Sequence, residues 1–149
     1  MPWKPYRTYS EKARHVIETN NYVTVATTDN EGNPWAAPVF FAYDKDYNLY
    51  FLSAVDSRHA ENLAQNPNIA AVIFDSTSPV GQSDGVQLEG KVIPVERKAV
   101  AKVINIYCKR LFPNSTSLNQ LASCSCAYTL PLYPDQAPLS RLPLAVSRP

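Results

Sequence analysis

The sequence lacks any strong excess of charge of one sign. Its 149 residues include 14 lysines and arginines against 13 aspartates and glutamates, which gives a formal net charge of +1. A charge so close to zero provides no overall field that would attract nucleic acid or an anionic membrane. The sequence also has no basic stripe with interleaved aromatic residues, so we do not expect nucleic acid as a partner.

A long hydrophobic run is also missing. No stretch reaches the roughly 20 consecutive apolar residues that cross a bilayer. The first residues, MPWKPYRTYSEK, do not contain the apolar centre of a signal peptide. We therefore expect a cytoplasmic protein that does not enter a membrane. The chain is nevertheless 45% hydrophobic, which is enough for the core of one domain of ordinary size.

Cysteine is scarce and unevenly placed. The three cysteines are Cys108, Cys124 and Cys126, an odd number that does not suggest a disulfide framework. Cys124 and Cys126 could contribute two thiolates to a metal site. However, no nearby histidine or further thiol completes a tetrahedral set. We expect reduced thiols and no metal.

Five segments have the alternating or β-branched pattern of strands. They are residues 22–29, 35–44, 49–55, 69–76 and 85–96. Short turn-forming sequences join the first three, which predicts an antiparallel meander. Pro38 indicates an edge, a bulge or an interruption in the second predicted strand, and Gly90 indicates a bend in the last one.

Three helices are expected around these strands. Residues 11–19 form the first, with Ser10 as its N-cap, residues 57–65 the second and residues 97–110 the third. The second ends before Asn66 and Pro67, because the residue before proline disfavours helical geometry. Few helices and a mostly consecutive antiparallel strand order favour a mainly β fold, a small barrel, over a doubly wound sheet.

The sequence changes in character after residue 110. Only three of its charged residues lie beyond that point, proline recurs at six positions from 113 to 149, and glycine is absent. Proline on this scale excludes a long helix or an uninterrupted central strand. We therefore divide the chain into a domain over residues 1–110 and a proline-rich C-terminal tail over residues 111–149. The tail is expected either to extend along a surface or to be disordered.

The clearest candidate for chemistry is the start of the second predicted helix, in the stretch SAVDSRHAENLAQNP. A helix start presents unpaired N–H groups and the positive end of the helix dipole, and phosphate binds readily there. Ser57 adds a hydroxyl, Arg58 a guanidinium that can bind two phosphate oxygens, and His59 a donor when suitably protonated. The alternative is that Ser57 only caps the helix while Arg58 and His59 are solvated.

The order of these segments resembles the pyridoxamine 5′-phosphate oxidase-like, FMN-binding split-barrel family. The similarity extends over about 100 residues, from residue 10 to residue 110. It includes a Gly-x-Pro turn, a Pro-Val strand that ends in Tyr-Asp, and a Tyr-Phe-x-Ser strand. A Ser-Arg-x-x-x-Asn-Leu helix start, an Asn-Pro break and the strand GVQLEGKV come next, in the family's order.

This resemblance implies an antiparallel split β-barrel, mainly β with a few flanking helices, that binds FMN. It also implies a homodimer with cofactor sites at the interface and a small-molecule substrate. Two positions depart from the family pattern, since His59 stands where lysine is usual and Gly85 lies about where some members use glutamine. The family's later strand, expected after the last helix, is not recognisable in the tail.

The resemblance also implies roles for individual residues. The flavin would be bordered by Pro38, Val39, Phe40 and Phe41. Its ring and ribityl chain would lie near Leu52 and Ser53, and its phosphate would face Ser57, Arg58 and His59.

Catalytic residues are not assigned, because no side chain is a convincing acid, base or nucleophile and the flavin itself would carry the electrons. The predicted function is that of an FMN-binding oxidoreductase, which transfers electrons between a small-molecule or nicotinamide donor and an acceptor. One alternative is a non-catalytic protein that binds or senses flavin, haem or deazaflavin. Another is a structural dimer that has lost the cofactor.

Overall fold

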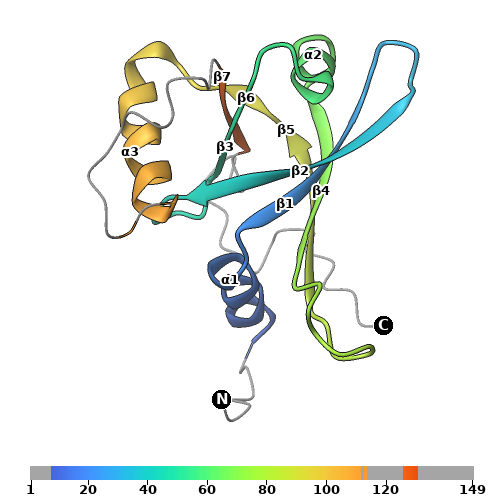
Figure 1. Ribbon diagram of the computed structural model, residues 1–149, viewed down its shortest axis with the longest axis vertical. Coiled ribbons are helices and arrows are strands. Elements are labelled where there is room, and N and C mark those ends of the chain that lie inside the picture. Colours follow the sequence, from blue (N-terminus) through green and yellow to red (C-terminus); the bar gives the residue numbers. More distant parts are fainter. Residues whose placement is uncertain (1–7, 112, 114–125, 131–149) are drawn as a thin grey trace.

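The structure, a computed structural model, describes residues 8–111, 113 and 126–130. Helices lie around a sheet of antiparallel strands (Figure 1), which confirms the mainly β fold class. No helix among these residues is long and apolar enough to cross a membrane. The elements in chain order are α1 (Tyr9–Thr19), β1 (Tyr22–Thr28), β2 (Pro34–Tyr43), β3 (Leu49–Ser53), α2 (Arg58–Gln65), β4 (Asn68–Phe74), β5 (Gly85–Lys91), β6 (Ile93–Pro94), the 3-10 helix η1 (Arg97–Ala99), α3 (Val100–Leu111) and β7 (Cys126–Leu130).

One continuous segment supplies both edges of the sheet. The strand order is β5-β4-β1-β2-β3-β7-β6, so the two outermost strands are separated in the chain by Val92 alone. Val92 is buried, and its N–H donates to the carbonyl of Pro67 at 2.8 Å. Because the chain bends there, the sheet closes on itself, as the predicted split barrel requires. The bend lies at Val92 and not at Gly90, which stays in the β5 ladder opposite Ile69.

Strand β2 joins the two halves of the barrel. Its residues from Pro34 to Phe40 pair with β1, and those from Phe41 to Tyr43 pair with β3. Pro38 lies opposite Thr24 in the first half, where no described strand pairs with the other side of β2. This placement agrees with the edge position that proline indicates.

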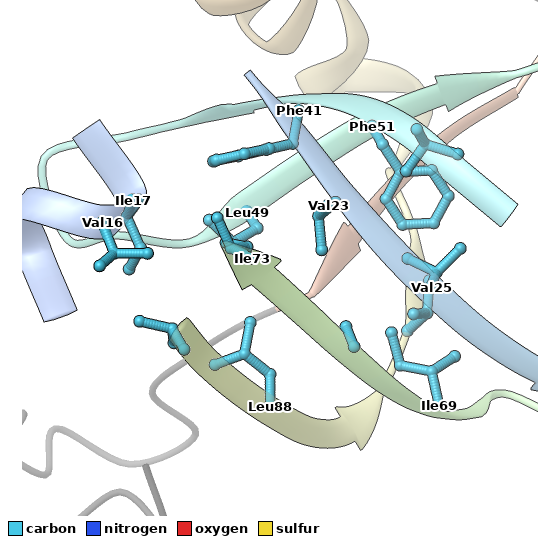
Figure 2. Close-up of a cluster of buried hydrophobic side chains, with 14 of the residues drawn as sticks. Val16, Ile17, Val23, Val25, Phe41, Leu49, Phe51, Ile69, Ile73 and Leu88 are labelled. Carbon is cyan, nitrogen blue, oxygen red and sulfur yellow. The ribbon is translucent and has the colours of Figure 1, made fainter. Parts of the chain in front are cut away.

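The core lies inside the barrel and under α1 (Figure 2). Phe41 and Phe51, cross-strand partners on β2 and β3, are almost fully buried among aliphatic side chains of the other strands. Val16 and Ile17 of α1 are buried in the same cluster. The helical spacing of the apolar residues in this first helix predicts that contact.

Helix α1 begins earlier than expected, and its N-cap is Thr8, so the prediction of Ser10 is wrong. The Thr8 hydroxyl accepts the N–H of Glu11 at 3.2 Å, and the Glu11 carboxylate accepts the N–H of Thr8 at 3.2 Å. A glutamate three residues after the cap completes this capping box. Ser10 has Ala13 at the corresponding position, which cannot return the bond.

Strand β7 lies in the C-terminal tail, where the sequence showed no recognisable strand after the last helix. The expectation that the tail lacks a strand is therefore wrong for Cys126–Leu130. The strand pairs with β3 on one side and β6 on the other. The chain has no proline between Pro113 and Pro131, so proline does not interrupt pairing within this strand. The expectation of an extended or disordered arm beyond Leu130 falls outside the described residues.

Two hairpin turns, residues 29–33 and 44–48, share one hydrogen-bond pattern. In each, the first aspartate accepts the N–H groups two and four residues later, and its second oxygen accepts the final asparagine amide. The fourth residue has a positive φ, 84° at Gly32 and 62° at Tyr47. Glycine adopts this conformation freely, whereas another residue is destabilised by about 1–2 kcal/mol.

The contacts of the Tyr47 side chain explain why this position tolerates tyrosine. Its ring stacks on Tyr43, with centroids 5.5 Å apart and an interplanar angle of 7°. The Arg14 guanidinium lies 6.0 Å from the ring centroid, and the hydroxyl donates to the Glu18 carboxylate. Burial, with the bond to Glu18, raises the pKa of Tyr47 to about 12. The turn between β2 and β3 is thereby fixed to α1.

We predict that Tyr47→Gly destabilises the protein even though it relieves the left-handed strain, because the stack on Tyr43 and the bond to Glu18 are lost. Gly32→Ala is the matched control, since open space surrounds this glycine and only backbone strain is added. That change should lower the free energy of unfolding by about 1 kcal/mol. Urea unfolding measures both. A Tyr47→Gly protein as stable as the unchanged one would contradict the stabilising role of this side chain.

Candidate functional site

The start of α2 lies beside the end of β3. Ser57 is the N-cap, as the alternative interpretation of this stretch had it, because its Oγ accepts the N–H of Ala60 at 3.4 Å. Its hydroxyl also donates to the carbonyl of Ala54 at 2.8 Å. The backbone N–H groups of Arg58 and His59 find no acceptor in the described part of the chain. The helix start therefore presents two unengaged donors at the positive end of its dipole.

His59 links Ser53 and Ser57. Its Nε2 lies 2.6 Å from Ser53 Oγ and 3.3 Å from Ser57 Oγ. Ser53 is only 6% exposed, so the imidazole joins the buried end of β3 to the first turn of α2. Burial lowers the pKa of His59, which favours the neutral ring at neutral pH. The structure thus brings together three of the predicted site residues.

Arg58 does not join this cluster, because its side chain extends toward the β1–β2 turn. The guanidinium carbon lies 4.5 Å from the centroid of the Trp35 ring, a cation–π contact. Hydrogen bonds from Asn33 lower the pKa of Asp29, and the positive charge of Arg58 lowers it further. The Arg58 side chain is exposed, so little besides Trp35 restrains it.

The buried polar side chains of the described chain, Thr27, Ser53 and Asn62, all contribute to the attachment of α2. Asn62 Nδ2 donates to Thr27 Oγ1 at 3.0 Å, a buried bond between α2 and β1. Asn66, the C-cap of α2, donates to Thr28 Oγ1 at 2.7 Å. Asn62, the asparagine of the Ser-Arg-x-x-x-Asn-Leu motif, is a positioning residue to which the sequence assigned no role. The available signal is its polar side chain beside Leu63 on the buried face of the helix.

The residues expected along the flavin divide between the two faces of the barrel wall. Val39 and Phe41 point into the core and are 7% and 0% exposed. They could reach a ligand only through their backbone. Pro38 is exposed, and Phe40 and Leu52 are partly exposed. These three alternate with the core residues and face outward.

Phe40 is the most constrained of the outward residues. Its ring contacts Tyr22 and Tyr107 edge-on, with centroid distances of 5.8 Å and 5.3 Å. The Tyr107 hydroxyl donates to the carbonyl of Phe40 at 3.0 Å, so α3 packs over this part of β2. Phe40 therefore offers only part of its ring to a ligand.

A hollow of about 530 Å³ lies on the outer face of β1, β4 and β5. Small side chains, among them Ala26 and Ala70, form its floor, and Gln87 and Glu89 stand on β5 at its side. Gln87 comes two residues after Gly85 and therefore faces the same side of β5. The family resemblance aligned Gly85 with the position where some members have a glutamine. In the structure a glutamine, Gln87, lies two residues further along the same strand.

The closed antiparallel barrel and the helix start beside β3 define a split-barrel protein with a candidate anion site. A family model described as pyridoxamine 5′-phosphate oxidase matches residues 9–125. The chain belongs to this pyridoxamine 5′-phosphate oxidase-like family.

The chain is also similar to curated relatives and to solved structures. A UPF0306 protein of Photorhabdus laumondii is 27% identical over 105 residues, which are 70% of this chain and 73% of that protein. HutZ, the heme storage protein of Vibrio cholerae, has a TM-score of 0.71 at 21% identity, over 89% of this chain and 93% of HutZ. An FAD-binding protein of Mesorhizobium loti has a TM-score of 0.65 at 14% identity, over 85% of this chain and 91% of that one.

Some matches cover only part of the other protein. The chain spans 54% of the Yersinia pestis UPF0306 relatives. It spans 55% of an Agrobacterium tumefaciens protein of unknown function, which has a TM-score of 0.71 at 21% identity and covers 87% of this chain. At these identities the solved structures establish the fold alone.

We predict that the neutral His59 ring makes stability fall in mild acid. The unfolded imidazole takes up a proton near its ordinary pKa of 6.5, whereas the folded one stays neutral to lower pH. Stability that depends on the neutral ring is therefore present above pH 6.5 and is lost as pH falls toward the folded pKa. Urea unfolding should show that the free energy of unfolding falls less between about pH 7.5 and about pH 5.5 in His59→Gln than in the unchanged protein. The glutamine does not titrate and can still bond to Ser53.

The control for this measurement is Gln65→Ala at the exposed end of the same helix, which removes no titratable group and should keep the pH dependence of the unchanged protein. Parallel losses in the unchanged protein and His59→Gln would show that the fold does not depend on the neutral imidazole.

Proposed function

We propose that this protein is a cytoplasmic FMN-binding oxidoreductase, which transfers electrons between a small-molecule or nicotinamide donor and an acceptor. The observation that carries this proposal is the start of α2. Two backbone donors without acceptors in the described chain lie there beside an arginine, and the Ser57 hydroxyl, which donates to the Ala54 carbonyl, would join them by exchanging that bond. This is the donor set that a phosphate ester requires.

Each residue would have a distinct part in holding the phosphate. The N–H groups of Arg58 and His59 would donate to phosphate oxygens directly. The Arg58 guanidinium would exchange its contact with Trp35 for a charge-assisted bond to the phosphate, which is the stronger interaction. His59, fixed by Ser53, would keep the Ser57 hydroxyl in position and not supply the positive charge of the usual lysine.

The flavin ring would need an apolar surface with a few polar contacts. Pro38 and Leu52 offer outward side chains on the strands that lead to the phosphate site, and Gln87 offers an amide on the outer face of β5. When bound, FMN supplies the capacity to accept and release electrons. The chain's contribution is to hold the phosphate, to limit water on one side of the ring and to provide hydrogen bonds.

We further propose that the protein is a homodimer with its cofactor sites at the interface. The outer face of β1 and β4 supports this, because the residues of these strands that line the hollow are small. Thr24, Ala26, Ala70 and Val72 all line the hollow there, and small side chains allow a second sheet face to approach closely. Residues of a second copy could then complete the surroundings of the ring.

Haem binding is the second candidate function, favoured by the description of HutZ as a heme storage protein. In that case the protein would carry or sense its ligand and not catalyse a reaction. Within the described chain the histidines give little support for an axial ligand. His59 Nε2 is bonded to Ser53, so binding iron through that atom would break a 2.6 Å contact. His15 lies on the exposed surface of α1.

We predict that Arg58→Ala weakens FMN by about ten- to a hundredfold, because a charge-assisted bond of about 1.5–3 kcal/mol is lost. Riboflavin, which lacks the phosphate, should bind the variant and the unchanged protein alike. Arg97→Ala, which removes an exposed arginine at η1, is the matched control and should bind both flavins normally. Flavin fluorescence titration measures the affinities.

Two results of this titration would contradict parts of the proposal. Equal weakening of FMN and riboflavin would mean that Arg58 acts through folding. Binding of neither flavin would contradict the cofactor assignment. If the protein then binds haem stoichiometrically, as judged by its absorbance, the second function replaces the first.

A further inference from the structure

A second hollow, of about 560 Å³, lies between the β2–β3 turn and α3. Residues 43–46 of the turn form one wall, and one face of α3 forms the other. It lies beside the Leu49 end of β3, whereas the candidate phosphate site lies at the Ser53 end, roughly 13 Å along the strand. Figure 1 shows α3 and α2 on different sides of the barrel. The volume is in the range of small-molecule sites.

The α3 wall presents two lysines with no ion-pair partner in the described chain. Lys102 and Lys109 are seven residues apart, which is about two helical turns, so they lie on the same face with Ile106 between them. The opposite wall carries Lys45 and two carboxylates, Asp44 and Asp46, so the lining as a whole has four positive and two negative groups. Lys45 pairs with Asp46 at 3.0 Å, and the Asp44 carboxylate accepts the Asn48 amide and the Tyr50 hydroxyl.

A fixed guanidinium adds to the positive charge of this hollow. Arg110 lies 4.9 Å from the centroid of Phe41 and 4.5 Å from that of Tyr43. Its Nη2 donates to the carbonyls of Ile17 and Asn20 at the end of α1. Its Nε is buried without an acceptor in the described chain, and a nearby anion would offset part of that electrostatic cost.

The wall formed by the turn is held rigid before any ligand arrives. Tyr43 is packed between Arg110 and Tyr47, and Tyr47 keeps its left-handed backbone through contacts with α1. A wall that does not need to be ordered on binding saves conformational entropy. It would also explain why the second turn has tyrosine where the first has glycine.

We propose that this hollow is a binding site for a small polyanion rich in phosphate or carboxylate groups. The ammonium groups of Lys102 and Lys109 approach the ligand from α3, and Arg110 contributes fixed charge at the end of the hollow. Tyr43 and Ile106 provide apolar surface for the uncharged part of the ligand. The proposal is independent of flavin binding, since none of these residues belongs to the α2 site.

The test uses isothermal titration of the full chain with inorganic pyrophosphate and, separately, with citrate at low salt. We expect saturable binding of one anion per chain in this hollow. Lys102→Gln with Lys109→Gln should weaken it about tenfold or more. The matched control, Lys91→Gln with Arg97→Gln, removes the same charge from two exposed positions outside the hollow and should bind normally. Arg58→Ala separates this site from the candidate phosphate site, because it should weaken any anion bound at the start of α2 and leave the anion bound beside α3 in place.

The outcomes divide clearly. Binding of both anions indicates recognition of charge, binding of pyrophosphate alone indicates a phosphate site, and binding of citrate alone indicates a carboxylate site. Each supports the proposal if the paired lysine variant loses it. Equal loss in the control pair would show nonspecific attraction, loss in Arg58→Ala would move the anion to α2, and no saturable binding would remove the site. The last three results overturn the proposal.

Discussion

The buried hydrogen bond between Asn62 and Thr27 fixes the position of α2, and the candidate site depends on that position. Both side chains are almost fully buried, so removing either partner would leave an unsatisfied polar group that destabilises the protein by about 1–3 kcal/mol. The bond anchors the second turn of α2 on β1, while His59 ties the first turn to Ser53 of β3. With both turns fixed, the free N–H groups at the helix start point to one defined place.

The closure of the barrel explains why Ser53 is a firm anchor. Strand β3 pairs with β2 on one side and with β7 on the other, where Ser53 lies opposite Cys126. The bend at Val92 brings β6 against β7 and completes the barrel on that side. Strand β3 is therefore a central strand. One of its ends leads to the candidate phosphate site and the other to the hollow beside α3. The core residues Phe41 and Phe51 lie between those ends.

Local features of the fold and site can be predicted from the sequence, whereas contacts between distant segments cannot. The hairpins, the cap at Ser57 and the end of α2 before Pro67 depend on neighbouring residues, and the structure agrees with them. The contact of Arg58 with Trp35 joins residues far apart in the chain, and no local pattern indicates it. Strand β7 was not predicted because it is short and is followed by a proline-rich segment. Its pairing with β3 and β6, which lie far from it in the sequence, stabilises it. The N-cap at Thr8 could be predicted from the sequence, because Glu11 follows it by three residues, as a capping box requires.

The central claim is that the free amides at the start of α2 bind the phosphate of FMN. Amide resonances of the 15N-labelled protein test it directly, with FMN and riboflavin added in parallel. We expect the Arg58 and His59 amides to shift strongly with FMN and little with riboflavin, while amides in the first turn of α1 do not move. Equal shifts with both flavins, or no shift at Arg58 and His59 when FMN binds, would contradict the claim.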